Sequence, residues 1–95
     1  MGDEIVDDDP YWSEEDLETQ LTRLGRQVAA ARALERGLSQ GRLAKRAGIT
    51  KSTVGKIEDG TGNPRLRTLL KVAAALKVPA AELLKGVPTD GNSLQ

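Results

Sequence analysis

Apolar positions recur at helical spacing in several stretches of this chain of 95 residues. The first stretch places apolar side chains at steps of four and three residues: Leu17, Leu21, Leu24, Val28 and Ala31. Ser13 precedes it as an N-cap, and the three acids that follow suit the positive end of a helix dipole. The pattern therefore predicts one long helix over residues 13–36, ended by Gly37.

Two short helices joined by a tight turn are predicted between Leu38 and Gly60. Their apolar positions are Leu43, Ala44 and Ala47 in the first helix, and Val54 and Ile57 in the second. Ser39 and Thr50 stand at the N-cap positions, and Gly48 between the helices can adopt the left-handed conformation that ends a helix. Helices this short are marginal alone, so the rest of the chain must hold them.

Two further helices are predicted over residues 65–76 and 79–85. The first is marked by Leu66, Leu69, Leu70, Ala73 and Leu76, and the second offers Leu83 and Leu84 to the core. The sequence thus predicts an all-α domain over residues 13–86, with five helices and an extended first helix. An acidic, disordered arm over residues 1–12 precedes it, and a flexible tail over 87–95 follows.

The net charge of zero hides a strong segregation of charge. Residues 1–20 contain nine acids and no base, whereas residues 21–95 contain all 14 bases and five acids, a net charge of +9. A basic body suits a polyanionic partner. No aromatic residue follows Trp12, which disfavours binding of single strands by base stacking.

Composition argues against an enzyme. The chain has no Cys and no His, so the common metal ligands and the usual general base at neutral pH are missing. The clustered acids, residues 7–9 and 14–16, lie on the arm or at the start of the first helix. We expect no cofactor and no metal. We also expect a cytoplasmic protein, because no apolar run reaches the length of a membrane span.

The stretch LSQGRLAKRAGITKSTVGKIEDG, residues 38–60, resembles the helix-turn-helix of the phage repressor and Cro family, the XRE-type regulators. The resemblance is carried by Leu38, Ser39, Gln40, Leu43, Ala44, Gly48, Ile49, Val54, Ile57, Glu58, Gly60 and Pro64. It extends weakly into residues 69–84 and covers roughly residues 24–86. It implies a repressor-like fold that binds double-stranded DNA to regulate transcription, commonly as a homodimer on a two-fold site. The alternative is a helical hairpin used only for packing.

The helix over about residues 50–58 is the expected recognition helix. If Val54 and Ile57 point inward, the outer face carries polar side chains that can enter the major groove. The resemblance places the base-reading positions on Lys51, Ser52 and Lys56, and lysine can donate to guanine. Gly55 either lets the helix approach the groove wall or is merely tolerated there.

Phosphate contacts are expected to set the register of this helix on DNA. Gln40 matches the family's phosphate-binding glutamine, and the further candidates are Thr50, Thr53, Asn63 and Arg65. We expect Arg42, Lys45 and Arg46 to lie on a solvated face. The resemblance gives a structural role to Gly48 and implies an ion pair between Glu58 and Arg32 of the first helix.

The acidic N-terminal segment leaves other functions open. It can serve as the partner-binding part of an antitoxin-type module, which would hold a basic partner protein near Tyr11 and Trp12 and also repress its own promoter. It can instead lie over the basic body and mimic phosphate. The extra turns of the first helix are either a simple extension or a dimer contact.

Overall fold

The computed structural model describes residues 10–85 of the chain. Within this range the chain forms five α-helices and no strand: α1 (Glu14–Ala33), α2 (Gln40–Ala47), α3 (Lys51–Asp59), α4 (Leu66–Leu76) and α5 (Ala80–Leu83). The prediction of an all-α fold with an extended first helix is therefore confirmed. The acidic residues 1–9 of the expected arm, and the expected tail, lie outside the described residues.

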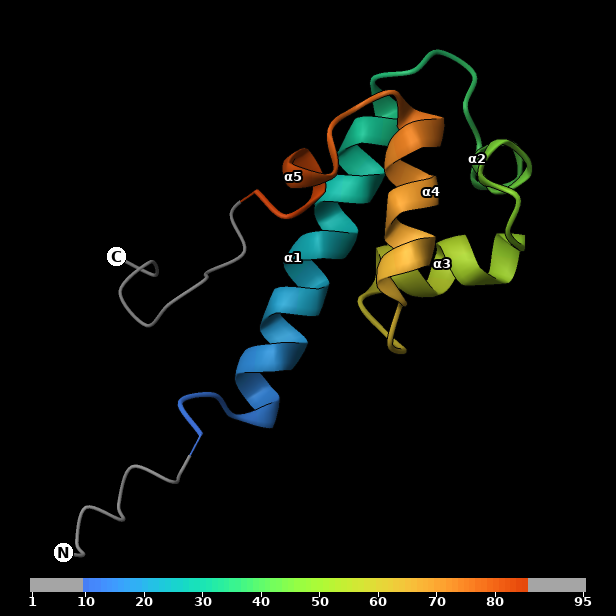
Figure 1. Cartoon of the computed structure of the whole chain (residues 1–95). Helices are drawn as coiled ribbons and strands as arrows, with labels where there is room; N and C mark the ends of the chain where they lie inside the picture. Colours follow the sequence, from blue (N-terminus) through green and yellow to red (C-terminus); the bar gives the residue numbers. More distant parts are fainter. Residues whose placement is uncertain (1–9, 86–95) are drawn as a thin grey trace, which may run out of the picture.

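Helix α1 is the long element against which the others are arranged (Figure 1). Helix α3 packs against α1 and α2, α2 also packs against α4, and the short α5 packs against both α4 and α1. The N-terminal turns of α1 extend beyond this group, and residues 14–19 are exposed. No helix within residues 10–85 has the length and apolar character needed to cross a membrane.

Three helices begin at side-chain N-caps that the sequence predicts. The Ser13 hydroxyl accepts from the Asp16 N–H at 3.1 Å, and the Asp16 carboxylate accepts from the Ser13 N–H at 3.2 Å, which is a capping box. Ser39 and Thr50 accept in the same way from N–H groups three residues later, each at 3.1 Å. These bonds satisfy backbone donors that a helix start leaves unpaired.

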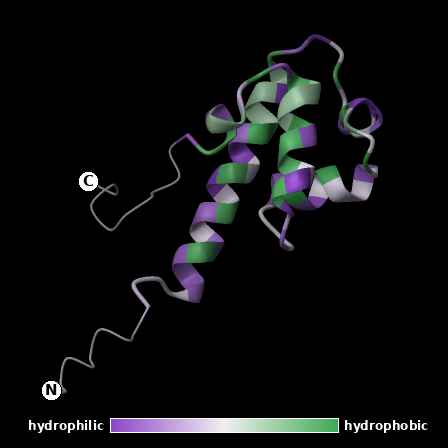
Figure 2. Ribbon diagram, viewed as in Figure 1, coloured by the Kyte–Doolittle hydropathy of each residue, from purple (hydrophilic) through white to green (hydrophobic). Residues whose placement is uncertain are grey.

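The hydrophobic core gathers one stripe from each helix and one residue of the loop before α2. Its buried members are Leu24, Val28, Leu38, Leu43, Ala44, Ala47, Val54, Ile57, Val72, Ala73, Leu76 and Leu83. Figure 2 shows apolar and polar residues alternating along α1 and mostly apolar residues along α4. The four-residue α5 contributes through Leu83, which is only 2% exposed.

Helices α1 and α3 approach backbone to backbone. A Cβ atom added at Gly25 would lie 2.5 Å from the Glu58 carbonyl oxygen, and one added at Gly60 would lie 2.8 Å from the Thr22 Cα. Only a residue without a side chain allows these approaches. The two glycines therefore fix the distance between α1 and the C-terminal end of α3.

Helix α1 ends three residues earlier than predicted, at Ala33 rather than at residue 36. The Glu35 N–H bonds to the Arg32 carbonyl and the Leu38 N–H to the Glu35 carbonyl, so the chain leaves the helix through tight turns. Leu34 is 88% exposed, and packing gives no reason to continue the helix. Gly37, with φ of +73°, lies within this connection instead of capping the helix.

The prediction for α5 was wrong at one core position, Leu84, and two of the leucines that mark α4 lie outside the core. Leu66, Leu70 and Leu84 are 68%, 49% and 48% exposed. Helix α4 turns Val72, Ala73 and Leu76 inward, which carries Leu66 and Leu70 to its outer side. Helix α4 begins at Leu66, after Arg65, and α5 is confined to Ala80–Leu83, so Leu84 falls beyond its last turn.

Candidate nucleic-acid interface

Helix α3 has one face in the core and one face in solvent. Val54 is fully buried and Ile57 is 3% exposed, which fixes the rotation of the helix about its axis. Lys51, Ser52 and Lys56, the predicted base-reading residues, are all exposed. Gly55 lies between them, and a Cβ added there would meet nothing within 4 Å. The outer surface of α3 is therefore open and carries two ammonium groups and a hydroxyl.

The turn before α3 positions its N-terminus. Gly48 caps α2 in the left-handed conformation, with φ of +71°, and Thr50 caps α3 two residues later. The hydroxyls of Thr50 and Thr53 lie 2.8 Å apart, and the Thr50 oxygen also accepts from the Thr53 N–H. These two candidate phosphate ligands thus form one polar corner at the start of α3. A Cβ at Gly41 would lie 4.0 Å from the Lys51 side chain, so the start of α2 is nearby.

Behind α3, one carboxylate joins three segments of the chain. Glu58 Oε2 accepts from Arg32 Nε at 2.7 Å, and Oε1 accepts from Arg32 Nη2 at 3.0 Å. Oε1 also accepts from Gln40 Nε2 at 2.8 Å, and Arg32 Nη1 donates to the Leu38 carbonyl at 3.1 Å. The structure thus contains the ion pair between Arg32 and Glu58, and it adds a bond to Gln40.

The ion pair perturbs both of its members. Burial alone raises the pKa of the Glu58 carboxyl, but the bonds from Arg32 and Gln40, with the Arg32 charge, outweigh burial and hold this pKa below its ordinary value. The bond to Glu58 raises the pKa of the Arg32 guanidinium. The Glu58 side chain is 6% exposed, so Arg32 balances a nearly buried charge.

The other candidate phosphate ligands surround a cleft beside the exposed face of α3. The cleft is lined by Thr53, Lys56, Ile57, Thr61, Gly62, Asn63, Pro64, Arg65 and Thr68. It thus brings Thr53 and Lys56 of α3 together with Asn63 and Arg65 of the following loop. Gln40 and Thr50 do not line this cleft; they lie at the starts of α2 and α3.

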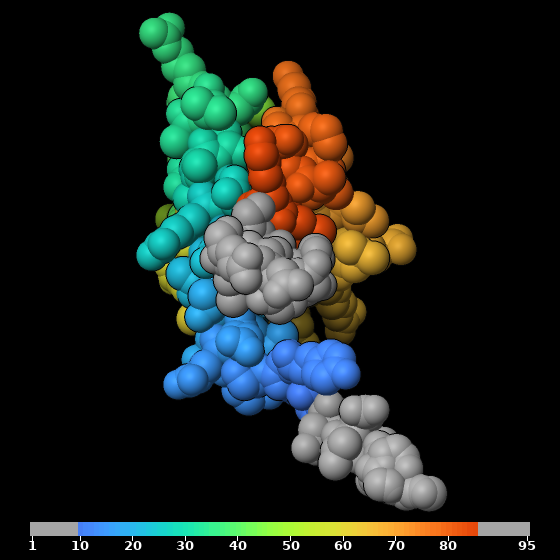
Figure 3. Space-filling view, turned by 90° about the vertical axis from the view of Figure 1, so that its left-hand side faces the viewer, coloured from blue at the N-terminus to red at the C-terminus, as the bar shows by residue number. Residues whose placement is uncertain are grey.

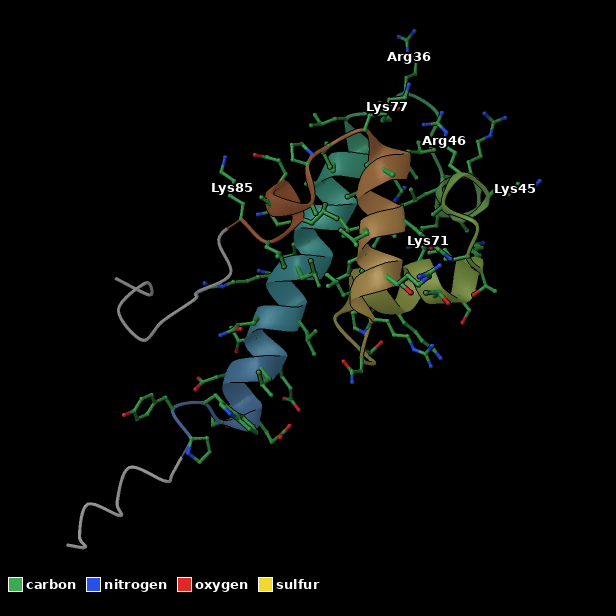
Figure 4. The ribbon with its side chains drawn as sticks, in the orientation of Figure 1. Arg36, Lys45, Arg46, Lys71, Lys77 and Lys85 are labelled. Atoms are coloured by element: carbon green, nitrogen blue, oxygen red, sulfur yellow. The ribbon has the colours of Figure 1, made fainter. Side chains whose placement is uncertain are left out.

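Many of the basic residues lie away from this surface. Figure 4 shows Arg36, Lys77 and Arg46 toward the end of the molecule opposite the N-terminus of α1, and Lys45 pointing outward from α2. Arg46 forms an exposed ion pair with Glu35 at 3.0 Å. These residues contribute to the general positive field of residues 21–95 rather than to the cleft.

The chain is similar to proteins of one helix-turn-helix family. A family model described as helix-turn-helix matches residues 28–83, which is more than half of the chain. The chain belongs to the XRE-type helix-turn-helix family. The first half of α1, with its acidic first turn, lies before the matched region.

Two relatives place the chain within this family. The crystal structure of the restriction-modification controller protein C.AhdI from Aeromonas hydrophila is similar with a TM-score of 0.65 and 37% identity, over 68% of this chain and 97% of that one. The HTH-type transcriptional regulator SutR of Escherichia coli is 42% identical over 45 residues. That match covers 47% of this chain and spans a quarter of the length of SutR.

The bond between Gln40 and Glu58 was not predicted from the sequence. Gln40 was assigned to phosphate alone and Glu58 to Arg32 alone. The sequence indicates only where each residue stands: Gln40 at the start of one helix and Glu58 on the inward side of the next. Helical periodicity gives the face of each residue but not the distance between faces.

Proposed function

We propose that this chain is a sequence-specific regulator of transcription that binds double-stranded DNA with α3 in the major groove. The observation that supports it best is the pairing of a buried side, Val54 and Ile57, with an open side that carries Lys51, Ser52 and Lys56. A helix fits the major groove, where base edges distinguish all four base pairs. Lysine at the two outer positions favours guanine. The role is one of binding and not of catalysis.

Phosphate contacts hold the helix in register in this proposal. The cleft beside α3 presents Asn63 and Arg65, the hydroxyls of Thr53 and Thr50 lie together at the start of α3, and Gln40 stands at the start of α2. Donors around a groove-reading helix suit contacts with the phosphates of the backbones that border the groove. The relatives are called a transcriptional regulator and a controller protein, which supports the same role.

A homodimer on a two-fold operator is part of the proposal. One module of this size contacts too little DNA for high specificity. Two modules on two half-sites discriminate more strongly between DNA sequences, because each half-site contributes its own base contacts. Selection of bound duplexes from a random pool tests both statements. We expect two inverted half-sites whose centres lie about one helical turn apart. A pool without enrichment would contradict sequence-specific binding, and a single unpaired site would contradict the dimer.

The selected duplex then tests the assigned residues. Lys51→Ala and Lys56→Ala should each weaken binding by about 1–3 kcal/mol and relax base choice. Gln40→Ala should weaken specific and random duplexes alike, because phosphates carry no sequence information. Lys77→Ala, on the far side of the molecule, is the control. Equal binding by the Lys51, Lys56 and Gln40 variants and the parent would contradict this docking.

A second role, binding of a basic partner protein, is favoured by the start of α1. A largely apolar groove there is lined by Leu17, Gln20, Leu21, Leu24, Asn63 and Leu84. The exposed acids of the first turn, Glu14, Glu15 and Asp16, stand beside it, and Trp12 is 52% exposed. Figure 3 shows this acidic end of α1 projecting past the rest of the fold. A cationic amphipathic helix has the matching chemistry.

A synthetic amphipathic peptide that forms a helix, with leucines on one face and lysines on the other, is a direct probe of that groove. We expect it to bind and to shift the emission of Trp12, the only tryptophan of the chain. Leu84→Ser should weaken this binding, whereas Leu34→Ser should not, although Leu34 is the more exposed leucine. Equal loss of peptide binding in both variants would contradict binding in this groove. Binding of polylysine as tight as that of the peptide would also contradict it.

A further inference from the structure

We infer that Glu58 is a positioning residue for DNA binding: it holds the Gln40 side-chain amide so that one N–H is presented to a DNA phosphate. The inference rests on the proposed function. It adds a role for a residue that does not itself touch DNA, beyond the structural ion pair with Arg32.

The Glu58 carboxylate fixes which end of the Gln40 amide faces it. An ionised carboxylate only accepts hydrogen bonds, so the group that faces Glu58 Oε1 at 2.8 Å must be the Gln40 NH2 and not its carbonyl. One amide hydrogen is used in this bond. The other remains for a second acceptor, and a phosphate oxygen is a suitable one. The Glu58 carboxylate thereby selects one of the two flip states of the amide.

The Gln40 side chain is held in place through Glu58 and Arg32. Glu58 is itself held by two bonds from Arg32, and Arg32 also donates to the Leu38 carbonyl, two residues before Gln40. The amide is therefore tied to α1, to α3 and to the connection that leads into α2. A glutamine side chain fixed before binding loses less rotamer freedom when it meets phosphate, which favours binding.

The negative charge of the Glu58 carboxylate is balanced by the Arg32 guanidinium. A free carboxylate this close to a phosphate ligand would repel the DNA backbone. Here its side chain is 6% exposed and faces the Arg32 guanidinium at 2.7 Å, so its charge is screened from the outer side. The pair therefore orients Gln40 while presenting little negative charge to DNA.

Glu58 connects the proposed phosphate contact of Gln40 with the proposed base contacts of α3. Glu58 belongs to α3, the proposed base-reading helix, and Gln40 is the first residue of α2, the helix before it. One carboxylate therefore sets the position of the phosphate contact relative to the base contacts. Disturbing it should weaken binding to every duplex, as loss of Gln40 does, and not alter base choice.

The test is a double-mutant cycle in DNA binding, with Gln40→Ala, Glu58→Gln and both together in the full-length chain. The probes are the selected duplex and a random duplex of the same length. Glu58→Gln keeps the size of the side chain but allows the Gln40 amide to flip, and we expect affinity for both duplexes to fall on the order of tenfold. In the Gln40→Ala background the same change should have no further effect. Independent, additive losses would overturn the inference.

Controls separate positioning from stability. Glu35→Gln removes the carboxylate of the exposed ion pair to Arg46 and should leave DNA binding unchanged. If Glu58→Gln does not fold, relaxation of the Gln40 side-chain amide in the unmodified protein decides the matter by NMR. An ordered amide supports the inference, and a mobile amide overturns it. Absence of duplex binding by the parent would contradict the proposed function instead, so the two failures are distinguishable.

Discussion

Replacing Gly25 by alanine tests the packing that orients the recognition helix. The new Cβ would lie 2.5 Å from the Glu58 carbonyl oxygen and 2.8 Å from the Glu58 carbonyl carbon. Both atoms belong to the backbone of α3, so no side chain can rotate away. Helices α1 and α3 must separate by about 1 Å to restore ordinary contact.

The size of the effect follows from three contributions. Overpacking of this kind costs about 1–3 kcal/mol, and the upper part of the range applies because backbone must move. The separation also stretches the bonds between Arg32 and Glu58, which begin at 2.7 and 3.0 Å, at a further cost of about 1 kcal/mol. Alanine in a helix gains about 0.5–1 kcal/mol over glycine. The net destabilisation is about 2–3 kcal/mol.

Gly55 supplies a matched control, because it also lies inside a helix but faces open space. Gly55→Ala should stabilise the fold by about 0.5–1 kcal/mol through helix propensity alone. Urea and thermal unfolding followed by circular dichroism measure both variants. For a domain of this size we expect Gly25→Ala to lower Tm by roughly 10–20 °C and Gly55→Ala to raise it. A Gly25→Ala variant as stable as the parent would refute the close approach of α1 and α3.

Three further predictions concern charge and backbone conformation. Lys77 ends α4 with φ of +61°, so Lys77→Gly should raise the unfolding free energy by about 0.5–1 kcal/mol in urea melts, and a loss would contradict that conformation. The lowered pKa of Glu58 contributes stability that is present above about pH 4.3, the ordinary value, and is lost as pH falls through the folded value. Glu58→Gln should therefore be less stable than the parent by a constant amount from pH 7 to about 5, with the difference shrinking below about pH 4; a difference independent of pH down to 2 would argue against an ionised pair. The logarithm of duplex affinity should fall linearly with the logarithm of salt concentration, and a flat salt response in filter binding would rule out phosphate contacts by Arg65 and its neighbours.

Local signals predicted most of the fold. N-caps at Ser13, Ser39 and Thr50, and the left-handed glycine at Gly48, depend on residues a few positions away, and they were predicted correctly. The errors came from tertiary choices. Leu84 was expected in the core, but packing of the neighbouring helices decides which apolar residues are covered.

The candidate site divides in the same way. The exposed face of α3 follows from the inward positions of Val54 and Ile57, so its three polar residues could be predicted from the sequence. The bond between Gln40 and Glu58 depends on the distance between two helices and could not. Gly25 is a further case, because nothing in the sequence indicates that another backbone passes it.

The structure of the complex with a selected duplex tests the central claim most directly. The account predicts that α3 lies in the major groove, with the Lys51 and Lys56 ammonium groups within hydrogen-bond distance of base edges. It also predicts the Gln40 amide against a phosphate oxygen. A complex in which α3 faces away from the duplex, or in which another helix fills the groove, would contradict it.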